Sequence, residues 1–255
     1  VAAAIAAGQF DLLEATVEKF QRASQALKYA QIPTVAAVQG LALGGGCEFV
    51  MHASKRVLAL ESYIGLVEAG VGLIPAGGGC KEFALRAAEL AQRTATPNEV
   101  FPFLQNPFMT IAMAKVSGSA LEAIDYGFAR ESDRVPFNAR EILHVALKEA
   151  RALADAGYAP PVPPRGIPVA GRTGIATLEM LLVNMKEGGM ISAHDYRVAK
   201  AAATALCGGD VDAGSRVDEE WLITVERRLF VELLKTPETQ ARIAHMLDTG
   251  KPLRN

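Results

Sequence analysis

The fold is decided by residues 32–48, which read IPTVAAVQGLALGGGCE. Within this stretch, the β-branched and alanine run Thr34–Val38 predicts a short buried strand. Gly40–Gly46 predicts a glycine-rich turn, and Glu48–Ala53 predicts a helix that follows it. Arg56–Leu60 has the pattern of a second strand. The order strand, turn, helix, strand predicts an α/β layer fold.

The sequence on either side of this stretch is mostly helical. Residues 9–30 place apolar side chains at alternating spacings of three and four, which predicts an amphipathic helix that ends before Pro33. Gly70–Gly79 is rich in glycine and predicts a structured loop, followed by a helix over residues 80–92. Further helical patterns cover residues 98–114, 119–126 and 138–156.

A proline-rich segment divides the chain. Five of the nine residues from Pro160 to Pro168 are proline, which predicts an extended linker. We therefore expect a core over residues 1–158, a linker over 159–171 and a helical C-terminal region over 172–255.

The C-terminal region has clear helix signals. Residues 173–186 form one helical pattern, Ser192 has the pattern of a capping box, and Thr236 precedes a proline at the first position of a helix. The helix between them has an apolar face that we expect in the core, formed by Trp221, Val225, Leu229 and Leu233. Its charged residues most simply form a solvated face, namely Glu219, Glu220, Glu226, Arg227 and Arg228.

Composition excludes several classes of protein. The 255 residues carry 26 Lys+Arg and 28 Asp+Glu, a formal net charge of −2, and half of them are apolar. A disordered chain would be less apolar, and a nucleic-acid binder would show a basic excess or stripe. The most apolar long stretch, residues 32–53, contains Pro33, Glu48 and four glycines, so it is no membrane span.

The cysteines indicate the compartment. Cys47, Cys80 and Cys207 lie far apart and form no CxxC pair. An odd, sparse set of this kind predicts reduced thiols and a cytoplasmic location.

Several cofactor motifs are absent from the sequence. Gly44–Gly46 is followed by Cys-Glu-Phe, so the G-x-G-x-x-G dinucleotide fingerprint fails, and neither a nucleotide P-loop nor HExxH occurs. Glu48 and His52 are four residues apart, but one Glu/His pair is a poor metal site. We expect no metal site.

The triple glycine Gly44–Gly46 is a candidate catalytic site. Gly44–Gly46 ends a turn and opens a helix, where unpaired N–H groups and the helix dipole can hold a developing oxyanion. Glu48 follows within the first turn, and Glu68 is a second acid isolated among apolar residues and glycine. Desolvation would raise the pKa of such carboxyls and suit them to proton transfer. The alternative is that the glycines form only a tight turn and Glu48 is a helix N-terminal charge.

Residues 32–48 resemble the signature of the crotonase superfamily, the enoyl-CoA hydratases and isomerases. Gly65–Glu68 and Gly72–Gly79 resemble the second motif of that family, in the same order. A weaker likeness continues through residues 119–127. The resemblance implies an α/β fold of the ClpP/crotonase type, here without its N-terminal strands, followed by a helical C-terminal region.

The resemblance also implies roles for individual residues. Glu48 and Glu68 would hold a water against the double bond of a trans-2-enoyl thioester, one assisting the attacking water and the other protonating the α-carbon. The N–H of Gly45 would form half of the oxyanion hole. The presence of both acids favours a hydratase over a double-bond isomerase, which typically needs only the acid at Glu68. The substrate-binding residues implied are Leu43, Gly44, Gly45 and Val67, the last where the family often has proline.

The family builds its first strands and its second oxyanion donor from about the first third of its domain. This chain begins without Met, at Val1, after that part, so we expect a fragment whose active site is incomplete. Residues 172–255 resemble the end of bifunctional β-oxidation proteins, in which a 3-hydroxyacyl-CoA dehydrogenase region precedes a C-terminal hydratase-like domain.

The expected function is syn-hydration of trans-2-enoyl-CoA to 3-hydroxyacyl-CoA, as part of a fatty-acid β-oxidation enzyme. Two alternatives stay open: the C-terminal region of an NAD-dependent 3-hydroxyacyl-CoA dehydrogenase, and a non-catalytic assembly module. The expected partners are an acyl-CoA thioester, an upstream dehydrogenase domain and further copies of the chain, since crotonase folds commonly trimerise. We expect no cofactor in this chain, and NAD only where the dehydrogenase domain exists.

Overall fold

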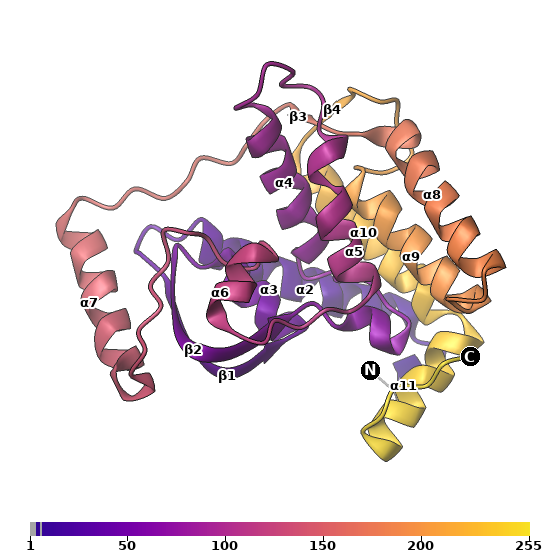
Figure 1. Cartoon of the computed structure of the whole chain (residues 1–255), viewed down its shortest axis with the longest axis horizontal. Coiled ribbons are helices and arrows are strands. Elements are labelled where there is room, and N and C mark those ends of the chain that lie inside the picture. Colours follow the sequence, from indigo (N-terminus) through magenta and orange to yellow (C-terminus); the bar gives the residue numbers. More distant parts are fainter. Residues whose placement is uncertain (1–3, 6) are drawn as a thin grey trace.

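The structure is a computed structural model that describes residues 4, 5 and 7–255. Residues 1–3 and 6 of the expected core lie outside the described residues. Figure 1 shows a strand pair below the centre of the view, a group of helices to its right and the helix over residues 142–155 to its left; a long extended segment runs from that helix to the group of helices. No helix in residues 4–5 and 7–255 has the length and apolarity needed to cross a bilayer.

A parallel β-α-β unit forms the frame of the N-terminal part. Strand β1 (Val35–Leu43) pairs with β2 (Lys55–Gly65), and helix α3 (Gly45–His52) connects them. β1 is longer than the sequence predicts, because residues 40–43 continue the strand instead of turning. The register shifts next to Gly40, whose φ of +79° is strained for residues other than glycine.

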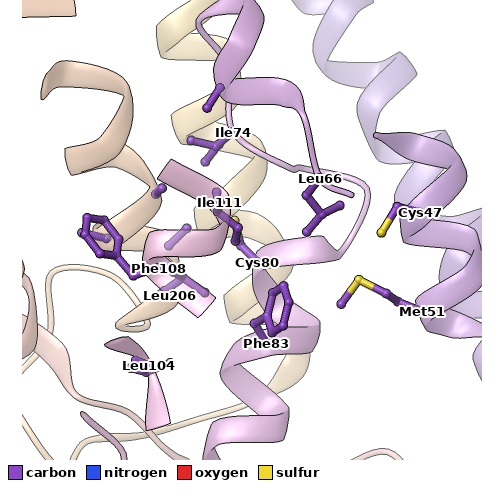
Figure 2. Close-up of a cluster of buried hydrophobic side chains, with 14 of the residues drawn as sticks. Cys47, Met51, Leu66, Ile74, Cys80, Phe83, Leu104, Phe108, Ile111 and Leu206 are labelled. Atoms are coloured by element: carbon purple, nitrogen blue, oxygen red, sulfur yellow. The ribbon is translucent and has the colours of Figure 1, made fainter. Parts of the chain in front are cut away.

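Helices on both sides of α3 enclose the first core. Helix α2 (Phe10–Lys28) confirms the predicted amphipathic helix, and α4 (Gly79–Ala91) follows a short 3₁₀ turn, η1 (Glu68–Val71). In Figure 2, Cys47 and Met51 of α3 point toward the same space as side chains from the segment after β2 and from α4. The labelled members of this buried cluster on that side are Leu66, Ile74, Cys80 and Phe83.

The middle of the chain covers the sheet and then leaves it. Helix α7 (Ile142–Asp155) packs on β2, with Ile142 and Ala146 against Val57 and Ala59. Beyond it, residues 157–166 form no helix or strand and run as the extended segment of Figure 1. The elements of this part are η2 (Phe101–Phe103), α5 (Gln105–Ala112), α6 (Ala120–Asp125), η3 (Ala139–Glu141) and α7 (Ile142–Asp155). The division into core, linker and C-terminal region stays a prediction.

The C-terminal region is helical, as expected. Ser192 forms the predicted capping box with Asp195, and the hydroxyl of Thr236 accepts the N–H of Thr239 at 3.3 Å. A small sheet joins this region to the end of the linker. Its elements are β3 (Ile167–Pro168), α8 (Gly171–Glu187), α9 (Ala193–Leu206), β4 (Arg216–Val217), α10 (Glu219–Leu234) and α11 (Pro237–Thr249).

Two sequence predictions for α10 are wrong in part: Val225 and Leu233 are buried as expected, but Trp221, Glu219 and Glu226 are not where they were expected. Trp221 is 41% exposed, and its indole N–H donates to the carbonyl of Gly208 at 2.8 Å. Glu219 and Glu226 are buried rather than on a solvated face. The two glutamates are buried because α10 packs against α2, α4 and α9 together, so the helix buries more of its surface than one apolar stripe.

Candidate active site

Helix α3 begins at a turn that requires glycine. Gly44 has φ +54° and ψ −126°, and its N–H donates to the carbonyl of Gly65 at 2.8 Å. The next N–H, that of Gly45, finds no hydrogen-bond acceptor among residues 4, 5 and 7–255. A free amide donor therefore lies at the positive end of the α3 dipole, where the sequence predicted an oxyanion donor.

Glu48 lies one turn into α3, with its carboxyl buried. The Oε1 atom accepts the N–H of Gly77 at 2.7 Å and that of Gly79 at 2.8 Å. Gly79 is the first residue of α4, so Glu48 caps the N-terminus of that helix. The sequence placed Glu48 at the start of its own helix. Only the fold shows that its carboxyl caps the following helix, α4.

The environment of Glu48 balances two opposing effects. Burial raises the pKa of Glu48 to about 7, while the N–H groups of Gly79 and Gly77 and the charge of Lys81 oppose this rise. Near neutral pH the carboxyl is thus divided between its protonated and ionised forms. A general acid or base works best with its pKa close to the working pH.

Glu68 opens the 3₁₀ turn η1, and its carboxyl lies beside the turn at Gly44. A Cβ built on Gly44 would lie 3.0 Å from Oε1 of Glu68. The Oε2 atom is buried and has no hydrogen-bond partner in the described chain. Burial, and then the charge of Glu48, raise the pKa of Glu68 well above its ordinary value. The two acids therefore share one desolvated environment, in which both do not readily ionise together.

The aromatic ring of Phe20, on α2, forms a wall next to both glycine turns. A Cβ on Gly45 would lie 2.9 Å from Cζ of Phe20, and Gly77 contacts the same ring. The ring of Phe49 follows at 4.6 Å between centroids. Sequence reasoning placed Phe20 only on the apolar face of its helix. The small residues at positions 45 and 77 are the signal that a large ring packs there.

The other expected binding residues lie around the same turn. Leu43 ends β1 opposite Gly65, and Gly44 follows it. Val67 precedes Glu68, and its Cγ2 lies 3.9 Å from a Cβ built on Gly44. The structure thus brings Leu43, Gly44, Gly45 and Val67 together with the two acids. Their role in substrate binding stays a prediction.

A buried charge network lies behind Glu48. Nδ1 of His52 is 2.6 Å from the carbonyl of Glu48, and its Nε2 is 2.8 Å from Nζ of Lys81. An ammonium group only donates, so Nε2 accepts and the proton is on Nδ1. Burial lowers the pKa of His52 to about 4, which keeps the ring neutral. Within the described residues, no three His, Cys, Asp or Glu side chains are grouped to hold a metal ion.

A third buried acid, Glu226 of α10, was missed by sequence reasoning. Its Oε2 accepts the backbone N–H of Lys81 at 3.0 Å, and its Oε1 accepts from Nε2 of Gln21 at 3.1 Å. A signal for its burial exists in the sequence, since Glu226 follows Leu222 by four residues and precedes Leu233 by seven. These spacings place Glu226 on the apolar face of the helix.

Comparison with known proteins gives a family match for the N-terminal part. Residues 4–95 match the sequence profile described as enoyl-CoA hydratase/isomerase. The matched span contains both glycine turns, Glu48 and Glu68. Over this span the chain is similar to the enoyl-CoA hydratase/isomerase family, which agrees with the crotonase resemblance of its motifs.

The curated relatives are much longer proteins. The chain is 42% identical over 239 residues to the probable 3-hydroxyacyl-CoA dehydrogenase of Bacillus subtilis, which covers 94% of this chain and 29% of that protein. It is 30% identical over 231 residues to the fatty acid oxidation complex subunit alpha of Idiomarina loihiensis, with coverages of 91% and 29%. The chain therefore spans less than a third of the length of these relatives.

Solved structures share the fold. The carnitinyl-CoA hydratase of Mycobacterium avium superimposes with a TM-score of 0.50 at 19% identity, over 89% of this chain and 64% of that one. The enoyl-CoA hydratase of Bacillus halodurans gives 0.50 at 16% identity, over 89% and 66%. The crotonase-like α/β fold expected from the sequence is thereby confirmed.

Proposed function

We propose that this chain carries the proton-transfer groups of an enoyl-CoA hydratase, as part of a longer fatty-acid oxidation enzyme. The reaction is syn-addition of water to trans-2-enoyl-CoA, giving 3-hydroxyacyl-CoA. The observation that carries the proposal is the pair of buried Glu48 and half-buried Glu68, both with raised pKa, beside the N–H of Gly45, which has no acceptor in the described residues.

The chemistry divides among these three groups. Water must lose a proton as its oxygen bonds to the β-carbon, the α-carbon must gain one, and the thioester oxygen carries negative charge in between. Ionised Glu48 takes the proton from water, and protonated Glu68 gives its proton to the α-carbon. The Gly45 N–H donates to the thioester oxygen. A proton then returns from Glu48 to Glu68, and the shared environment of the two carboxyls favours one proton between them.

The test is hydration of a trans-2-enoyl-CoA by the full-length protein, followed through the loss of the conjugated thioester absorbance. Glu48→Gln and Glu68→Gln are each expected to lower kcat by roughly 10²–10⁴-fold. Glu61→Gln, at an exposed position on β2, is the matched control and should keep full activity. Circular dichroism checks that each variant is folded. If both Glu48→Gln and Glu68→Gln keep wild-type rates, the acids are wrongly assigned.

A second function is favoured by the name of the B. subtilis relative, and it lies outside this chain. A 3-hydroxyacyl-CoA is what hydration would produce, and an NAD-dependent dehydrogenase domain upstream would oxidise it. NAD would then belong to that domain, and the acyl-CoA thioester would be the substrate shared by both. We expect a G-x-G-x-x-G fingerprint in the residues that precede Val1. Glu48→Gln should leave NAD-dependent oxidation unchanged while it lowers hydration.

The non-catalytic alternative is favoured by one contact. Glu48 already has a structural role as the cap of α4, which it would keep in a module that serves assembly only. A folded oligomer that binds no acyl-CoA analogue would favour this alternative. The oligomeric state and the cytoplasmic location stay predictions.

A further inference from the structure

Two carboxyls from distant parts of the chain share the N-terminus of α4. Oε1 of Glu48 accepts the N–H of Gly79 at 2.8 Å, and Oε2 of Glu226 accepts the N–H of Lys81 at 3.0 Å. Gly79 and Lys81 are the first and third residues of α4. The two acids therefore bind donors in the same helical turn, at the positive end of one helix dipole.

Glu226 is tied to three elements at once. It belongs to α10, caps α4 through Lys81 and is held by Gln21 of α2, whose Nε2 also donates to the carbonyl of Ile223 at 3.0 Å. The ammonium of Lys81 does not neutralise Glu226 directly, because it binds Glu82 at 2.7 Å and Glu219 at 2.9 Å. Glu226 is thus a fully buried acid held by uncharged donors.

The three buried carboxyls interact through their charges. Burial first, and the charge of Glu48 second, raise the pKa of Glu226 to about 8. The charge of Glu226 in turn contributes to the raised pKa of Glu68. Because Glu48 ionises at a lower pH than Glu226, the charge of Glu226 develops after that of Glu48 and acts on Glu68, which still carries its proton. The other titratable groups that face Glu226 are Cys80 and Lys81 of α4, while α2 presents the neutral Gln21.

We propose that Glu226, from the C-terminal helical region, is a positioning residue for the acid pair Glu48 and Glu68. It fixes the first turn of α4, which presents Gly79 to Glu48, and its carboxyl takes part in the proton sharing of the cluster. Glu226 acts through Lys81 and Glu48 and contacts no reacting atom. The inference rests on the proposed hydratase function and makes α10 a part of the active site.

The experiment uses the full-length protein with Glu226→Gln, which removes the charge and keeps an oxygen to accept from Lys81. In the variant the charge that helps Glu68 keep its proton is gone, so the alkaline limb of the kcat/KM profile, where Glu68 loses that proton, should move to lower pH. Glu232→Gln, an exposed acid on the same helix, is the control and should leave the profile unchanged.

A second readout does not depend on activity. The infrared C=O stretch of protonated carboxyls is recorded against pH, and the Glu68 band is assigned by its loss in Glu68→Gln. The midpoint of that band should fall in Glu226→Gln by the same amount as the kinetic limb. Absence of hydratase activity in the wild-type protein refutes the proposed function but still leaves this spectroscopic test of the proton sharing.

Two results overturn the inference. One is an unchanged Glu68 midpoint in Glu226→Gln, whether or not the rate falls, because a merely structural role would lower the rate without moving the midpoint. The other is an equal shift in Glu232→Gln, which would mean that general surface charge, and not the buried contact, sets the midpoint.

Discussion

Glu48 accepts the backbone N–H of Gly79 at 2.8 Å, so the acid proposed for proton transfer also caps helix α4. The same contact fixes the position of the carboxyl that α3 projects. It also means that a substitution at the start of α4 is expected to alter the proposed chemistry, and a substitution of Glu48 is expected to alter the start of α4.

Gly79→Ala is expected to disturb both the cap and the acid. A Cβ at this position would lie 2.9 Å from Oε1 of Glu48 and 2.8 Å from Cβ of Pro75. We expect destabilisation of about 1–3 kcal/mol by overpacking, together with a loss of hydratase activity. Gly46→Ala is the control, because its Cβ meets no atom of the described residues within 4 Å beyond its chain neighbours and its own helix backbone, and helix α3 gains about 0.5–1 kcal/mol. Urea denaturation measures both, and equal effects in the two variants would contradict the prediction.

Glu48→Met and Glu68→Met should change stability in opposite directions. Glu48→Met leaves the N–H groups of Gly77 and Gly79 without their acceptor, at a cost of about 1–3 kcal/mol. Glu68→Met removes a buried oxygen that has no partner in the described residues, so we expect a gain of about 1 kcal/mol or more above neutral pH.

Both methionine variants should lose hydration activity. If Glu68 belongs to a functional site, Glu68→Met should raise the free energy of unfolding and abolish activity, because functional sites keep groups that destabilise the fold. Thermal melts near pH 8 compare the two variants. Destabilisation by Glu68→Met would show that its carboxyl is satisfied in solution.

Glu226→Gln should become relatively more stable as the pH rises. The pKa of Glu226 is raised in the folded state from about 4.5 to about 8, so the native chain keeps a proton that the unfolded chain has lost. The folded state therefore loses stability as the pH rises from about 4.5 to about 8, by about 1.4 kcal/mol for each pH unit. Glu226→Gln lacks this loss.

The measurement is the free energy of unfolding of wild type and variant at several pH values from about 4 to about 9. The difference between them should grow with pH up to about 8 and stay constant above it. Glu232→Gln should show no such trend. A flat difference for Glu226→Gln would mean that Glu226 ionises normally in the folded protein.

Lys81→Met tests the buried charge network. The ammonium of Lys81 is 1% exposed and binds Glu82 at 2.7 Å and Glu219 at 2.9 Å. Its removal leaves buried carboxylates short of a partner, at a cost of about 3–5 kcal/mol. Lys186→Met removes an exposed ammonium that pairs with Glu187 and should cost less than about 0.5 kcal/mol. Equal melting temperatures for the two variants would contradict a buried network.

The sequence predicted the features that depend on local geometry. The turn before α3 was expected from three successive glycines, and Gly44 does adopt a conformation that other residues avoid. Ser192 and Thr236 were expected as caps because a hydroxyl reaches an N–H three residues away whatever surrounds it. The crotonase-like motifs placed Glu48 and Glu68 next to this turn.

Features that depend on distant contacts could not be predicted in the same way. Glu226 and Lys81 are separated by 145 residues, and Glu226 and Gln21 by 205. Helical periodicity indicates the face of the helix on which a residue lies. It does not indicate which N-terminal N–H group of another helix the carboxylate will bind. Glu219 and Glu226 were expected in solvent because they are charged, and both are buried. The spacing of Glu226 indicates the apolar face of the helix, but not the N–H of Lys81 that its carboxylate accepts.

The amino-acid sequence alone determined the β-α-β unit, the glycine turn and the identity of the two candidate acids, because backbone conformation and motif spacing are local properties. Only the tertiary structure decided that α10 closes the same site with a third carboxyl and that Glu48 caps α4. Helix ends and buried charges find their partners through packing, and packing joins residues that the chain keeps far apart.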